Sequence, residues 1–181
     1  MKKLNLTAGR ITLISLFTAI AFGLSFLEFP IFPATPFLEL DFSFAILLIG
    51  GFMFGPVSAE IMIVALQLLK LVASQSFGVG ELANFITANC FIFVPSLFYK
   101  FKKGIKVVII SLILAILLQT LAATLSNKFI LFPLYGLNDE AFSSAFWFIV
   151  AFNVIKGVVN GAITLILYKR LKFLFTKFID L

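Results

Sequence analysis

The stretch IKVVIISLILAILLQTLAATLSN, residues 105–127, decides the fold class, because beyond Lys106 it contains no charged side chain. A helix needs about 20 consecutive apolar residues to cross a bilayer, so this stretch predicts a membrane span. The composition agrees: 62% of the 181 residues are hydrophobic and 12% are charged, whereas about 25% of residues are charged in soluble domains. We therefore expect an integral membrane protein with one transmembrane domain over residues 1–181.

Apolar runs separated by turn residues predict an all-α bundle of six transmembrane helices. Their expected ranges are 10–28, 42–54, 57–74, 82–99, 105–127 and 144–172. The second helix is short, and we expect Gly50, Gly51, Gly55 and Pro56 to close it before a tight reversal into the third.

The distribution of charge predicts the orientation, because Lys and Arg near span ends stay on the cytoplasmic side. Eleven of the 14 cations lie in three stretches on one side of the predicted bundle, residues 2–10, 100–106 and 169–177. Six of the eight acids lie in the opposite connections. Both termini are thus expected in the cytoplasm, and the net charge of +6 marks topology and not nucleic-acid binding. Removal of the first helix as a signal peptide would leave five spans and contradict this pattern.

The absent residue types exclude several kinds of chemistry. The chain has no His, which excludes a His-based triad and a His metal site, and its single Cys90 excludes an intrachain disulfide. No segment matches the phosphate-binding pattern G-x-x-x-x-G-K-[ST], so energy from ATP must come through partner proteins. With no paired carboxylates in a span, the sequence predicts a protein that is not an enzyme.

The connections on the acidic side are unusually apolar. Residues 29–41, FPIFPATPFLELD, combine a proline at every third position with bulky side chains, which indicates either a lid or a loop in the lipid interface. The connection at 74–85 is rich in glycine. A third connection is expected at 127–140, NKFILFPLYGLNDE.

Polar residues inside the spans indicate a binding site, because an unpaired polar group in hydrocarbon costs several kcal/mol. Asn153, Lys156 and Asn160 share one stripe of the last helix. A lysine at that depth marks a functional site by default, and snorkelling to the interface is the alternative.

Two more polar edges point to the same half of the membrane. On the fifth helix a polar edge is formed at every fourth position by Gln119, Ala123 and Asn127. At the start of the fourth helix, Glu81, Asn84 and Thr87 are spaced three residues apart. Their convergence predicts a pocket open to the outside under the apolar connections. Each amide taken alone is equally compatible with hydrogen bonding between helices.

The first helix carries a small residue at every fourth position, Ser15, Ala19 and Gly23. This spacing allows another helix to approach closely. It predicts a docking strip for a partner subunit, and packing inside the bundle is an equal alternative.

Five segments in this order resemble one family: FPIFPATPFLELDFS at 29–43, GGFMFGP at 50–56, GELANF at 80–85, LFPLYG at 131–136 and FNVIKG at 152–157. The sequence is similar over nearly its whole length to the riboflavin-specific substrate-binding subunits, or S components, of energy-coupling-factor (ECF) vitamin transporters. It departs from the family pattern at Phe44 and Ala45, where another acid and a proline are usual.

The resemblance implies a six-helix fold with cytoplasmic termini, a flavin site facing outward and no enzymatic activity. It also implies that an ECF transmembrane coupling subunit and two cytoplasmic ATPases are the partners. Ser15 and Ala19 match its docking motif. The residues that match ligand contacts of the family are Asn127, Asn153 and Lys156, then Glu39, Leu40 and Asp41 of the first loop, Tyr135 and Gly136 of the fifth, and Asn84.

Riboflavin suits this inventory of residues, since its flat ring needs apolar walls and its polar edge needs a few fixed donors. The chain offers 25 Phe and few buried donors. Two alternatives stay open from the sequence: an S component for another vitamin, such as thiamine or FMN, and a self-sufficient secondary transporter. The second is disfavoured because Glu60 is the only acid within a span.

Overall fold

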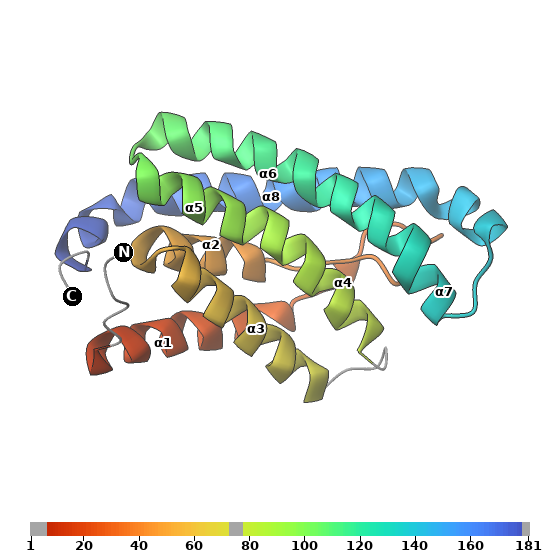
Figure 1. Ribbon diagram of the computed structural model, residues 1–181, viewed down its shortest axis with the longest axis horizontal. Coiled ribbons are helices and arrows are strands. Elements are labelled where there is room, and N and C mark those ends of the chain that lie inside the picture. Colours follow the sequence, from red (N-terminus) through yellow and green to blue (C-terminus); the bar gives the residue numbers. More distant parts are fainter. Residues whose placement is uncertain (1–6, 73–77, 179–181) are drawn as a thin grey trace.

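The computed structural model describes residues 7–72 and 78–178, with side chains to residue 171, and shows six helical segments packed as a bundle (Figure 1). The prediction of six helices is confirmed. The segments are α1 (Ala8–Ser25), α2 (Ser43–Phe54), α3 (Pro56–Val72), the run α4 (Val79–Ala88), η1 (Asn89–Phe93) and α5 (Val94–Phe101), the run α6 (Ile105–Ser126), η2 (Asn127–Leu131) and α7 (Phe132–Leu134), and α8 (Asp139–Phe178).

Four of these segments are long and apolar enough to cross a membrane: Ala8–Ser25, Val79–Phe101, Ile105–Leu134 and Asp139–Leu171. The start of α1, the α5–α6 turn and the end of α8 lie at one end of the bundle, on the left of Figure 1. The connection from α1 to α2 and the α7–α8 turn lie toward the other end. Many large hydrophobic side chains, such as Leu117 and Ile110, are exposed on the outside of the bundle, as expected for residues that contact lipid.

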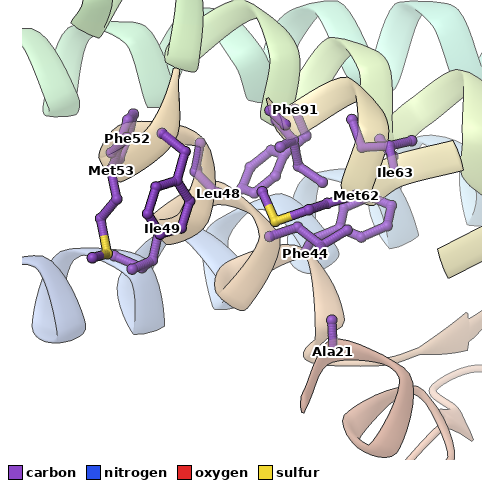
Figure 2. Close-up of a cluster of buried hydrophobic side chains, with 14 of the residues drawn as sticks. Ala21, Phe44, Leu48, Ile49, Phe52, Met53, Met62, Ile63 and Phe91 are labelled. Atoms are coloured by element: carbon purple, nitrogen blue, oxygen red, sulfur yellow. The ribbon is translucent and has the colours of Figure 1, made fainter. Parts of the chain in front are cut away.

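The short helix α2 is the centre of the bundle. It is apolar on all sides because all sides meet protein, and Phe44, Leu48 and Ile49 are almost fully buried (Figure 2). Gly50 and Gly51 lie inside α2, so the expectation that they close the helix was wrong. A Cβ on Gly50 would lie 2.7 Å from the Met62 side chain of α3, which shows that these glycines permit close packing. The helix ends at Gly55, whose φ of +87° suits glycine.

Two helical runs contain a π-helical turn with closely similar sequences, NCFIFVP at 89–95 and NKFILFP at 127–133. In both, the first Asn donates a hydrogen bond to the carbonyl four residues earlier, and a proline follows the turn. Proline lacks an N–H and its ring clashes with the preceding turn, and a π-turn relieves both problems without ending the helix.

This device explains the main error in the predicted boundaries. We expected residues 127–140 to form a loop, yet the helix continues to Leu134 and α8 begins at Asp139. A second boundary also differs from the prediction. Helix α4 begins at Val79, so the second half of the expected 74–85 connection is helical. The expected end of the third helix at residue 74 lies outside the described residues.

The connection from α1 to α2 forms a small antiparallel hairpin, β1 (Phe29–Pro30) with β2 (Glu39–Leu40), in which Phe29 faces Leu40. Leu38 and Leu40 are buried against Phe132 of α7 and against Phe142 and Phe152 of α8. This second apolar cluster holds the hairpin on the bundle. The all-α prediction therefore needs one addition, a two-stranded ribbon beside the polar helix ends.

Candidate functional site

A cavity of about 810 Å³ opens between the hairpin, α4, α6 and α8. Six of the nine predicted ligand residues line it: Glu39, Asn84, Asn127, Tyr135, Asn153 and Lys156. The other three, Leu40, Asp41 and Gly136, are not among its lining residues. Polar groups that lie far apart in the sequence thus converge on one space, at the end of the bundle that carries the hairpin.

Lys156 lies at the polar centre of this site and is 2% exposed. Its Nζ lies 2.9 Å from Asp41 Oδ2 and 3.0 Å from Asn84 Oδ1, and it stands 4.5 Å from the centroid of the Phe44 ring. The side chain therefore does not snorkel to the interface. An ammonium has three donors, so one remains for a ligand after these two bonds.

Asp41 is buried beneath Lys156 and is not among the residues that line the cavity. Its Oδ1 accepts hydrogen bonds from the backbone N–H and the hydroxyl of Ser43, which places the carboxylate at the start of α2. Burial alone would raise the pKa of Asp41. The Lys156 ammonium and the Ser43 bonds outweigh that effect and hold the pKa below its usual range. Asp41 is thus the counter-ion of Lys156.

Asn160 is the residue whose structural role the sequence did not reveal. Its Oδ1 accepts the N–H of Ala45 at 3.0 Å, and its Nδ2 donates to the carbonyl of Asp41 at 2.9 Å. From α8 it therefore caps the start of α2, where a helix leaves N–H groups unpaired. The capping residue is 115 positions away from the helix it caps, so no local pattern reveals it.

Asn127 and Asn153 each keep part of their side-chain amide available in the cavity. Each uses one amide N–H on its own helix, bonding to Ala123 O at 2.8 Å and to Ile149 O at 2.9 Å. Within the described part of the chain, the remaining N–H and the oxygen of each amide have no protein partner. Both residues can therefore give and accept a hydrogen bond in the cavity.

Gln119 holds two of the site helices together. It is fully buried, and its Nε2 donates to the backbone carbonyl of Asn153 at 2.7 Å. A Cβ on Gly157 would lie 2.6 Å from the same Nε2, so only glycine leaves room for this bond. Gln119 thus fixes α6 on α8 beside Asn153 without lining the cavity.

Charged residues also line the cavity near the hairpin. Glu28, which follows α1, accepts a hydrogen bond from Lys70 of α3 at 2.9 Å. Burial raises the pKa of Glu39, and the nearby Glu28 carboxylate raises it further. Spacing in the sequence does not reveal this pair, because Glu28 and Lys70 are 42 positions apart.

The walls of the cavity are largely aromatic. Phe22, Phe26, Phe37, Phe132 and Phe152 line it, from α1, the hairpin, α7 and α8. Across the residues that the structure describes, no cluster of three His, Cys, Asp or Glu is arranged to hold a metal. The site therefore suits a flat organic ligand with a polar edge.

Ser15, Ala19 and Gly23 all lie on the exposed face of α1. A Cβ on Gly23 would meet nothing within 4 Å. Gly136 lies in the turn before α8 with a φ of +68°, and Leu40 is buried in the hairpin cluster. Tyr135, which lines the cavity, is 48% exposed.

Comparison with known proteins agrees over most of the chain. The family model described as ECF transporter, substrate-specific component matches residues 9–168. The riboflavin transporter RibU of Staphylococcus aureus is 38% identical, with 94% of each chain covered. The riboflavin transporter FmnP of Bacillus subtilis is 29% identical, with 90% of this chain and 92% of that protein covered.

The structural comparison leads to the same family. A solved structure of the S component of a bacterial ECF transporter superimposes with a TM-score of 0.81 at 37% identity, covering 92% of this chain and 96% of that one. The chain is thus a multi-pass membrane transport protein and not an enzyme. It belongs to the family of substrate-specific components of ECF transporters.

Proposed function

We propose that the chain is a riboflavin-specific S component, which binds the vitamin outside the cell and delivers it for ATP-driven uptake. The observation that carries the proposal is the cavity of about 810 Å³ in which Asn127, Asn153 and Lys156 face one space between aromatic walls. The relatives named above, which are riboflavin transporters, support the choice of ligand.

The chemistry of the cavity fits a flavin. The isoalloxazine ring is flat and apolar on both faces, which matches the phenylalanine side chains of the wall. One edge of the ring alternates carbonyl oxygens with an N–H. Two amides that both give and accept, together with one free ammonium donor, can satisfy that edge. Because Asp41 neutralises Lys156, the ligand need not carry a charge.

The orientation and the partners belong to the same proposal. The start of α1, the α5–α6 turn and the end of α8, near which most of the cations lie in the sequence, are at the end of the bundle opposite the hairpin. This arrangement supports cytoplasmic termini and a cavity that faces outward. An ECF coupling subunit and two ATPases supply the energy. Ser15, Ala19 and Gly23 form the docking strip on the exposed face of α1.

Binding by the purified protein tests the ligand. Because a buried ammonium and an amide are each expected to bond to the flavin, Lys156→Ala and Asn153→Ala should each weaken riboflavin binding at least tenfold, as charge-assisted or buried hydrogen bonds are worth about 1.5–3 kcal/mol. Flavin fluorescence is the suitable signal, since Trp147 is 75% exposed and does not line the cavity.

Two matched variants serve as controls. Asn89→Ala removes the amide that starts the other π-turn, and Lys128→Met removes an exposed lysine; neither residue lines the cavity. Both proteins should bind riboflavin as the parent does. A parent protein that purifies without flavin and binds none on titration would rule out the proposal.

A further inference from the structure

The residues around the cavity carry a net negative charge, whereas the chain as a whole carries a net positive charge. Three acids, Glu28, Glu39 and Glu81, and two cations, Lys70 and Lys156, line it. Asp41 lies directly behind Lys156 and adds a fourth carboxylate. The chain has a formal net charge of +6, yet the space that receives the ligand has more acids than cations.

Each of the two lining cations already has a carboxylate as its counter-ion. Lys156 pairs with Asp41 at 2.9 Å, with both side chains 3% exposed, and Lys70 pairs with Glu28 at 2.9 Å. Glu39 belongs to neither of these two pairs and adds a further carboxylate to the lining. Lys128 of η2 is outside the lining, and its ammonium stands 5.5 Å from the Phe129 ring centroid and 5.9 Å from that of Phe142.

The helix end that lines the cavity gives no compensation. Phosphates often bind at helix N-termini, where the backbone N–H groups and the helix dipole favour negative charge. Val79, Gly80 and Glu81 at the start of α4 line the cavity, but Glu81 already places a carboxylate in that first turn. A second anion there would be repelled by the first.

We infer that the site selects unphosphorylated riboflavin against its phosphate ester, FMN, and that Glu28 and Glu39 are the residues that set this specificity. The inference rests on the proposed function. A phosphate ester carries a charge of about −1.5 to −2 at pH 7. Within about 8 Å of one carboxylate, at an effective dielectric between protein surface and water, such a group is disfavoured roughly tenfold.

The pairing of Glu28 with Lys70 allows the specificity to be shifted in both directions. Glu28→Gln removes one carboxylate and frees the Lys70 ammonium, so the ratio of the Kd for FMN to the Kd for riboflavin should fall about tenfold. Lys70→Gln leaves Glu28 unpaired, so the same ratio should rise. Glu140→Gln makes the same change at an exposed acid outside the lining and should leave the ratio unchanged.

Titration of the full-length protein in detergent with riboflavin and with FMN measures these ratios. The parent should bind FMN at least tenfold more weakly than riboflavin, and added salt should reduce the difference by screening. Equal or tighter binding of FMN, or an unchanged ratio in folded Glu28→Gln, overturns the inference. Should that variant not fold, Glu39→Gln and the salt series decide in the same way. Failure of the parent to bind either flavin instead overturns the proposed function.

Discussion

Asp41 supports the candidate site from behind the cavity wall. It neutralises Lys156, bonds to Ser43 at the start of α2 and is bonded through its carbonyl to Asn160. Asp41→Asn would leave a buried ammonium without a counter-ion, which costs about 3–5 kcal/mol. We expect a clear fall in the thermal midpoint at pH 7, measured with purified protein, whereas Asp139→Asn on the exposed start of α8 should have little effect.

Acid should remove the difference between the Asp41→Asn variant and the parent. The folded pKa of Asp41 is below its unfolded value, so its contribution to stability is complete above the unfolded pKa of about 3.9. It is lost as the pH falls through the folded pKa. The two midpoints should therefore differ fully at pH 7 and approach each other below about pH 4. A constant difference over that range would show that the Asp41 charge is not responsible.

The sequence revealed the residues that face the cavity more readily than those that support them. Lys156, Asn153 and Asn127 stood out because polar side chains are rare in spans and need a reason. Nothing in the sequence shows that Asp41 lies behind the cavity wall, because its partner Lys156 is 115 positions away. The bond from Gln119 to a backbone carbonyl depends on the gap that Gly157 leaves, and spacing alone does not predict such a gap.

At the scale of elements, apolar runs located the helices well, and proline misled. Pro133 and Gly136 suggested a loop, whereas the π-turn Asn127–Leu131 carries the helix past the proline. The effect on the site is direct, because Asn127 begins that turn and lines the cavity. A π-turn changes the direction of the side chains that follow it.

The packing of α2 leads to a prediction about one glycine. A Cβ on Gly51 would overlap the Ser96 hydroxyl of α5 and lie 3.1 Å from the Ala59 Cβ of α3. Gly51→Ala should therefore destabilise the protein by about 1–3 kcal/mol, read as a lower thermal midpoint. Combining it with Ser96→Ala should restore part of the loss. Gly9→Ala is the matched control, since nothing lies within 4 Å of its added methyl group; equal effects at both glycines would refute the packing argument.

At the scale of the whole molecule, the ligand site and the proposed docking strip are separate. Ala19 lies on the exposed face of α1 and is absent from the lining of the cavity. Ala19→Leu should reduce co-purification with the ECF coupling subunit while riboflavin binding by the isolated chain stays as in the parent. Ser143→Leu at an exposed position of α8 offers a comparable enlargement away from the strip. Parallel loss of assembly and binding would mean that Ala19 packs inside the bundle.

The hairpin is attached to the bundle unequally at its two ends. Strand β2 leads straight into Asp41, which Lys156 and Asn160 hold from α8. Strand β1 follows Phe26 and Leu27, which are 61% and 59% exposed. The end at β1 is held by the ion pair of Glu28 with Lys70, whose side chains are 33% and 13% exposed, so a swing of the ribbon about Asp41 would have to break that pair. On the proposed function, a route for the vitamin beside α1 would leave the buried pair of Lys156 and Asp41 intact.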